Sequence, residues 1–152
     1  MIVLLDANVL LRLSEPGAAL YSTAYDAVAI LQKQGFVLHC VPQSIYEFRV
    51  VATRPIVNNG LGLSIAETES EIASILSFFP LIDDASGLFA EWRTLVTSHR
   101  CHGKIAHDAR IVAAMQTHGL THLLTFNVGD FTRFPNITIL DPKAIAAGFT
   151  VP

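Results

Sequence analysis

The apolar residues of the chain fall into two kinds of segment, which alternate along its length. Short unbroken apolar runs bounded by polar residues are typical of strands buried on both faces of a parallel sheet. Longer segments repeat their apolar positions every three or four residues, as amphipathic helices do. The predicted strands are residues 2–5, 36–41, 122–125 and 137–140, with a shorter one at 81–82. The predicted helices are residues 7–13, 18–34, 42–53, 64–79, 86–100 and 106–118.

Several of these helices carry a recognisable signal at their start. Pro42 opens one helix, since proline is well tolerated in a first turn. Ser64 and Glu67 have the spacing of a capping box, and Ser86 is predicted to cap a later helix. Strands that alternate with helices predict an α/β fold, here a three-layer α/β/α sandwich with a central parallel sheet.

The composition of the chain predicts the number of domains, the cellular compartment and the presence of a partner. The 152 residues contain no repeat or linker, so we expect a single domain over residues 1–152. Hydrophobic residues make up 51% and the mean hydropathy is +0.46, which suggests that a partner covers part of the apolar surface. We expect a cytoplasmic protein with no membrane contact, because no apolar run could cross a bilayer and no signal peptide is recognisable. Cys40 and Cys101 lack metal-ligand spacing and are predicted to be free thiols.

Four of the 13 acidic residues stand apart from turns, helix termini and solvated helix faces. Asp6 ends the first predicted strand, and Asp130 lies just beyond a later one. Glu47 shares its helix stripe with Val50, and Asp108 lies on the apolar stripe of its own helix, in the first turn. In a parallel α/β sheet these points share one edge, where ligands bind.

Each of the four carboxylates, taken alone, is also explained by an ordinary structural role. Asp6 and Asp108 can cap or begin a helix, Glu47 can pair with an arginine, and Asp130 can form an Asx turn. All four at one edge favour a shared site. Carboxylates without cysteine or histidine on the same stripe form a hard oxygen site, which suits Mg²⁺ or Mn²⁺ better than Zn²⁺. Such a site is suited to phosphodiester hydrolysis.

Basic residues accompany these carboxylates along the chain. Six of the ten Lys and Arg residues lie within seven positions of one of them: Arg12, Arg49, Arg54, Lys104, Arg110 and Arg133. Cations around an acidic pocket suit a nucleic-acid backbone, although each of the six is also compatible with ordinary surface charge. The net charge of −3 argues against bulk electrostatic binding of long duplexes.

Together these segments resemble the PIN-domain nucleases, and most closely the VapC-type toxins of bacterial toxin–antitoxin pairs. The resemblance covers residues 2–142 and rests on four pieces in a fixed order. They are an apolar strand followed by Asp6-Ala7-Asn8, the helix segment 44–48 around Glu47, His107-Asp108-Ala109, and the segment 125–131. The segment 52–62 resembles one branch of that family.

The resemblance implies an endoribonuclease that hydrolyses RNA and depends on Mg²⁺ or Mn²⁺. By motif position, Asp6, Glu47 and Asp108 would bind the metal. Asn8 would hold Asp6 or its loop in place, and Thr125 would line the site.

The fourth acidic position is where this sequence departs from the family pattern. Many relatives have Asp two residues after the threonine, and this chain has Asn127 there. Asp130 either substitutes for it or only lies nearby. We expect Asn127 to face the site and Asp130 to support it, and a neutral residue there favours one tightly held ion over two.

Partners follow from the apolar surface and from the resemblance. Helices 18–34 and 64–79 carry wider apolar faces than one side of a small sheet needs, although packing on the sheet and on each other is the alternative. The resemblance implies a homodimer that a small antitoxin holds inactive, with the antitoxin tail crossing the acidic pocket. We therefore expect a groove lined by residues of 18–34 and 43–79 that accepts an apolar helix.

Two other functions compete with this interpretation. A phosphatase of the haloacid dehalogenase type also begins with a strand and an aspartate, but it needs a second Asp where this chain has Asn8. A catalytically weak PIN-like module would bind RNA or a partner without cutting it, and the three carboxylates argue against it. Nothing in the sequence names the RNA or the antitoxin.

Overall fold

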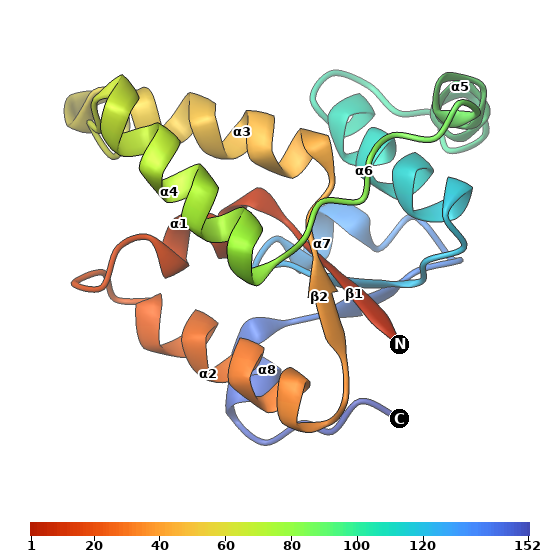
Figure 1. The fold of residues 1–152 in the computed structure, drawn as a ribbon. Coiled ribbons are helices and arrows are strands. Elements are labelled where there is room, and N and C mark those ends of the chain that lie inside the picture. Colours follow the sequence, from red (N-terminus) through yellow and green to blue (C-terminus); the bar gives the residue numbers. More distant parts are fainter.

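A four-stranded parallel sheet in the order β2-β1-β3-β4 forms the centre of the fold (Figure 1). The computed structural model describes residues 1–152. The strands are β1 (Ile2–Leu5), β2 (Val37–His39), β3 (His122–Leu124) and β4 (Thr138–Leu140). β1 pairs with both β2 and β3, and the pairing of Leu4 with His39 and with Leu123 fixes its register. The carboxyl ends of β1 and β3 therefore lie side by side.

Helices follow the strands on both faces of this sheet. The first half of the chain has α1 (Ala7–Leu13), α2 (Tyr21–Lys33), α3 (Pro42–Thr53), a 3-10 turn (Ile56–Asn58) and α4 (Ile65–Phe78). The second half has α5 (Leu88–Ser98), α6 (Ile105–Thr117), α7 (Val128–Phe131) and α8 (Pro142–Ala146).

Two separate hydrophobic cores show why this is a three-layer α/β/α sandwich. Side chains alternate along a strand, so Val3 and Leu5 enter one core while Leu4 enters the other. The first core also holds buried residues of α1, α2, α3, α4 and α8. The second holds those of α5, α6 and α7. In Figure 1, α2 and α8 lie together at the lower left, and α5 and α6 lie at the upper right. The predicted fold class is confirmed.

Several predicted boundaries and caps were wrong. Residues 81–82 form no strand, since Leu81 makes only an isolated parallel bridge to Cys40. α2 begins at Tyr21, because residues 18–20 are turn-like. α5 begins after Gly87, which has no side-chain cap, so Ser86 is not its cap. The capping box at the start of α4 is present, with the Ser64 hydroxyl accepting a hydrogen bond from the amide of Glu67.

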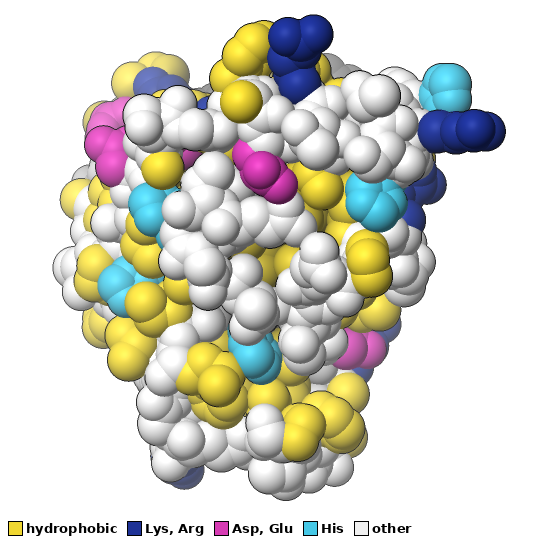
Figure 2. All heavy atoms as spheres, turned by 90° about the vertical axis from the view of Figure 1, so that its right-hand side faces the viewer, with side chains coloured by type: hydrophobic (Ala, Val, Ile, Leu, Met, Phe, Trp, Pro, Cys, Tyr) yellow, Lys and Arg dark blue, Asp and Glu magenta, His cyan; other side chains and the backbone are white.

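The surface carries no continuous basic patch on the face shown in Figure 2, where the visible Lys and Arg side chains stand mostly at the upper and right-hand margins. None of the helices is both long and apolar enough to span a membrane. Cys40 is buried and Cys101 is partly buried, and both are free thiols. Burial raises the pKa of Cys40 to about 12, so this thiol has little thiolate character at neutral pH.

Candidate functional site

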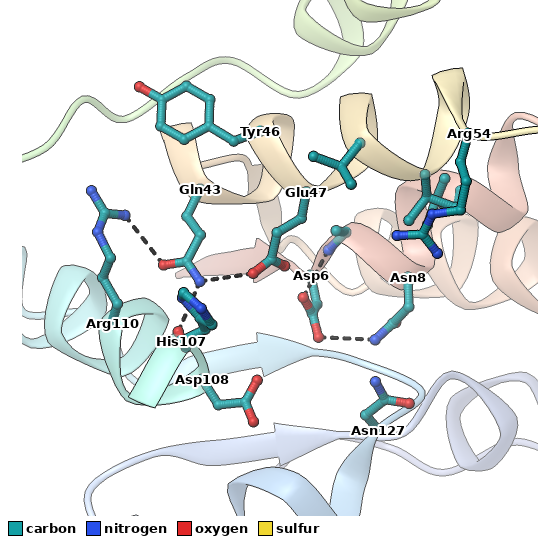
Figure 3. A pocket seen from close by; sticks show the side chains of 14 residues that line it. Asp6, Asn8, Gln43, Tyr46, Glu47, Arg54, His107, Asp108, Arg110 and Asn127 are labelled. Atoms are coloured by element: carbon teal, nitrogen blue, oxygen red, sulfur yellow. Dashed lines mark hydrogen bonds between the residues drawn. The ribbon is translucent and has the colours of Figure 1, made fainter. Parts of the chain in front are cut away.

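A pocket of about 660 Å³ opens at the carboxyl edge of the sheet, where β1 ends and where α3 and α6 begin. Figure 3 shows side chains from the ends of β1 and β3 and from α1, α3 and α6 converging on it. It is lined by three of the four predicted carboxylates, Asp6, Glu47 and Asp108. We call it the acidic pocket. Residues far apart in the sequence meet here because parallel strands end at the same edge.

Asp6 is fixed at the back of the acidic pocket by hydrogen bonds to both of its oxygens. Oδ1 accepts from the amide of Ala7 at 2.8 Å, so the side chain also caps α1. Oδ2 accepts from the Asn8 amide nitrogen at 2.9 Å and from the Thr125 hydroxyl at 2.8 Å. The side-chain oxygen of Asn8, Oδ1, in turn accepts from the backbone amide of Phe126 at 3.0 Å. These bonds leave the Asp6 carboxylate little freedom to rotate.

Glu47 is held by a neighbour that the sequence reasoning missed. Gln43, one turn earlier on α3, is buried and donates to Glu47 Oε1 at 2.9 Å and to the backbone oxygen of His107 at 2.8 Å. Its own side-chain oxygen accepts from Arg110 at 3.2 Å, and Arg110 also pairs with Asp84 at 2.8 Å. Figure 3 shows this chain of contacts from Arg110 to Glu47. The spacing of four residues between Gln43 and Glu47 was the available signal.

The stripe assigned to Glu47 needs a correction. Val50 is 57% exposed, whereas the buried face of α3 is formed by Pro42, Gln43, Ser44, Phe48 and Ala52. Glu47 lies at the margin of that face. It reaches the acidic pocket because α3 is anchored beside β1, with the Ser44 hydroxyl donating to the backbone oxygen of Leu5 at 2.8 Å.

Asp108 lies in the first turn of α6 with an incomplete set of hydrogen bonds. Its Oδ2 is buried and has no hydrogen-bond partner. In Figure 3 its carboxylate points into the space between Glu47 and Asn127. A buried carboxylate oxygen without a donor is costly, so this site is suited to a bound cation.

Burial, together with neighbouring negative charge, raises the pKa values of two carboxylates in the pocket. Burial raises the pKa of Asp6 from 3.8 to about 6, and the charge of Glu47 adds to this, against the lowering effect of the Thr125 hydrogen bond. Burial also raises the pKa of Asp108 to about 6, with further contributions from Asp130, Asp6 and Glu47. Lys104 offsets only part of that effect.

Two residues, Asn127 and Asp130, are candidates for the fourth acidic position of the family pattern. Asn127 lines the acidic pocket, and its backbone amide donates to the Thr125 hydroxyl at 3.0 Å. Asp130 lies on α7, does not line the pocket, and acts on Asp108 through its charge. Thr125 is fully buried behind Asp6.

The six basic candidates are placed unevenly. Arg54 and Arg110 line the acidic pocket, and Lys104 lies close enough to lower the pKa of Asp108. Arg49 forms an ion pair with Glu69 of α4 and does not line the pocket. Neither Arg12 nor Arg133 lines it.

The donor set of the acidic pocket consists of oxygen atoms, as a hard divalent cation requires. As the side chains stand, no three His, Cys, Asp or Glu residues converge closely enough to hold one ion. Asp6 and Glu47 are held by hydrogen bonds, so the coordination of an ion would be completed mainly by rotation of Asp108, whose Oδ2 has no hydrogen-bond partner. The unpartnered oxygen of Asp108, together with the pKa values that burial and neighbouring carboxylates raise, makes this site suited to a bound cation.

An acidic pocket at the carboxyl edge of a parallel sheet, inside a three-layer sandwich, defines an α/β protein with a carboxylate-lined site suited to a divalent cation. The family model for the PIN domain matches residues 3–136, and the chain therefore belongs to the PIN domain family. No curated protein matches the chain significantly by sequence.

Solved structures with a similar fold include several from toxin–antitoxin pairs. VapBC2 from Rickettsia felis, bound to a promoter DNA fragment, aligns with a TM-score of 0.72 and 18% identity over 93% of this chain and 98% of that chain. A toxin–antitoxin complex from Klebsiella pneumoniae aligns with a TM-score of 0.61 and 22% identity, over 92% of this chain and 97% of that chain. Mycobacterium tuberculosis VapC20, described as a sarcin-ricin loop cleaving toxin, aligns with a TM-score of 0.58 and 16% identity, over 97% and 96%. At these identities the likeness establishes a shared fold.

Proposed function

We propose that the protein is a Mg²⁺- or Mn²⁺-dependent endoribonuclease that acts as the toxin of a toxin–antitoxin pair. The observation that carries this proposal is the convergence of Asp6, Glu47 and Asp108 on one pocket, where Asp108 has a buried oxygen without a hydrogen-bond partner. Membership of the PIN domain family supports it, as does the presence of an RNA-cleaving toxin among the proteins of similar fold.

Asp6, Glu47 and Asp108 would hold the ion, with Asn127 as a neutral fourth oxygen donor. An Asn at that position favours one ion rather than two, because it contributes no charge to a second site. A bound divalent cation lowers the pKa of a water molecule and offsets negative charge on the leaving oxygen. Asp130 would act at a distance by adding negative charge beside Asp108.

The chain's own residues position the reacting groups. Thr125 and Asn8 keep the Asp6 carboxylate in one orientation, and Gln43 does the same for Glu47. Arg54 and Arg110 line the acidic pocket and would bind the RNA phosphates that flank the cleaved bond. The other four basic candidates would contribute to affinity only if the RNA runs beyond the pocket.

We further propose that a small antitoxin binds a groove between α2 and α4. This groove is a pocket of about 340 Å³ with eight hydrophobic lining residues. Tyr25 and Phe78 border it and are 57% and 71% exposed, which is unusual for large hydrophobic side chains without a partner. It is suited to an apolar helix. A basic side chain of the antitoxin tail would then compete with the metal for the acidic pocket.

Cleavage of purified RNA with and without metal tests the catalytic proposal. We expect cleavage in Mg²⁺ or Mn²⁺, none in EDTA, and a loss of about 100-fold or more in Asp6→Asn and Asp108→Asn, because ligand loss removes the ion that activates water. Full activity in EDTA would contradict it.

A second function has one observation in its favour. No three acidic side chains converge on a single point as they stand, which would suit a PIN-like module that binds RNA or a partner without cutting it. Metal-independent RNA binding without cleavage in any divalent cation would support that alternative.

A further inference from the structure

A second hollow, of about 540 Å³, adjoins the acidic pocket, and His107 and Arg110 line both. Two aromatic rings of α5, Phe89 and Trp92, line this hollow. They are stacked, with ring centroids 5.9 Å apart and an interplanar angle of 26°. We call it the aromatic hollow. Its shared residues make it a continuation of the acidic pocket along α6.

The aromatic pair is fixed relative to the carboxylates. The Trp92 indole N–H donates to the backbone oxygen of Ala106 at 2.7 Å, two residues before Asp108 on the same helix. Leu88 and Leu95 are buried and hold α5 against α6. Any group that lies on these rings is therefore at a set distance from the acidic pocket.

The chemistry around the rings suits a nucleotide better than an apolar peptide. Phe89 is 67% exposed, and the guanidinium carbon of Arg93 lies 5.9 Å from its ring centroid. Arg110, at the boundary of the two pockets, adds a second cation. Aromatic rings next to cations bind single-stranded nucleic acid by stacking with bases while the cations meet the phosphates. An apolar helix would leave the Arg93 guanidinium without an anionic partner, whereas Arg110 is already paired with Asp84, which also lines the hollow.

We propose that the aromatic hollow binds one base of the substrate RNA, stacked against the Phe89–Trp92 pair, while the neighbouring phosphate occupies the acidic pocket. This inference rests on the proposed ribonuclease function and adds to it a subsite for an unpaired base. Because a duplex keeps its bases stacked on each other, the subsite selects single-stranded or looped RNA.

Trp92 is the only tryptophan of the chain, so its fluorescence reports on this hollow directly. The test titrates metal-free protein in EDTA with short 2′-O-methyl oligonucleotides of A, C or U. We expect saturable quenching, and little quenching by an abasic oligonucleotide of the same length. Phe89→Ala should weaken binding about ten-fold, since it removes one stacking partner, and Phe89→Tyr should restore it.

Phe149→Ala is the matched control, because Phe149 is also exposed but lies near the C-terminal end, outside the acidic pocket, the aromatic hollow and the groove between α2 and α4. In cleavage assays Phe89→Ala should raise KM and leave kcat nearly unchanged.

If the protein cleaves RNA and Phe89→Ala alters neither KM nor oligonucleotide affinity, the subsite is refuted while the ribonuclease proposal stands. If Phe89→Ala changes the mass of the oligomer in solution, as measured by light scattering, but leaves the affinity for bases unchanged, the hollow is an interface between copies and the subsite is again refuted. If oligonucleotides quench Trp92 but no metal supports cleavage, the ribonuclease proposal fails and base binding stands.

Discussion

Gln43 connects three parts of the site through one buried amide. Its nitrogen holds Glu47 and the first turn of α6, and its oxygen accepts from Arg110. Residues that orient a metal-binding carboxylate commonly change metal affinity by 10- to 100-fold when they are replaced. The position of Glu47 is therefore expected to depend on Gln43.

Replacing Gln43 with Leu should weaken Mn²⁺ binding about ten-fold, as measured by calorimetry without RNA. It should also lower the free energy of unfolding by about 1–3 kcal/mol, because buried partners of the amide lose their hydrogen bonds. Gln34→Leu is the control, since Gln34 is exposed at the end of α2. Unchanged Mn²⁺ affinity in Gln43→Leu would show that Glu47 does not depend on this contact.

The charge of Asp108 makes the stability of the metal-free protein depend on pH. Its pKa is about 6 in the folded protein against 3.8 ordinarily, so the folded state holds the proton more tightly than the unfolded chain. Ionised Asp108 therefore destabilises the metal-free fold increasingly as the pH rises from about 4 to about 6, and fully above that.

Asp108→Asn should accordingly stabilise the protein in EDTA at pH 8. After allowance for its partial exposure the gain is about 1 kcal/mol, or about 2–4 °C in Tm. The two proteins should converge near pH 4, and Mn²⁺ should stabilise only the wild type. Asp26→Asn, on the exposed side of α2, is the control. A lower Tm for Asp108→Asn in EDTA at pH 8 would mean that its charge is compensated in some other way.

The sequence identified single carboxylates better than their supporting contacts. Asp6 could be found because it ends a strand, and Asp108 because it lies on an apolar helix stripe. The stripe assigned to Glu47 was wrong, although this residue also lines the pocket. The contact between Gln43 and His107 could not be found, because it depends on how α3 and α6 approach each other. The choice between Asn127 and Asp130 likewise required the path of the loop after β3.

Helices and strands were predictable in proportion to their length. The long amphipathic helices, such as α4 and α6, follow from apolar spacing, and the strands from apolar runs. α7 has only four residues, too few to show a helical period. α8 was also missed, although Asp141 caps it and Pro142 opens it, because aspartate before proline is equally typical of a turn.

The groove between α2 and α4 should tolerate substitution without loss of catalysis. Tyr25→Glu or Phe78→Glu should abolish co-purification with the antitoxin, because a charge would be buried against its apolar helix. RNA cleavage by the free protein should remain, since neither residue lines the acidic pocket. The measurement is a tagged pull-down with a candidate antitoxin, to be sought as a small reading frame next to this gene. Phe149→Glu, 51% exposed near the C-terminal end, is the control. Retained binding in both groove variants would place the antitoxin elsewhere.

At the scale of the whole molecule, several large hydrophobic side chains are exposed to solvent. Val50, Ile56 and Val57 are 57%, 75% and 89% exposed at and beyond the end of α3. We expect a symmetric dimer that covers this surface. Light scattering should give twice the chain mass of 16.5 kDa, and Val57→Glu should shift it toward the monomer. A wild-type monomer at micromolar concentration would contradict the dimer.

The hydrogen bond between Thr125 and Asp6 joins residues 119 positions apart. A ribosome adding 5–20 residues per second needs about 6–24 s to make the stretch between them. Throughout that interval the nascent chain already carries Asp6, yet it lacks the hydroxyl that orients it and, for most of the time, Asp108 as well. On an unfinished chain the acidic pocket is therefore incomplete, so the nuclease activity proposed above would begin only when synthesis is nearly finished. The antitoxin proposed above, if translated alongside, would have those seconds in which to fold first.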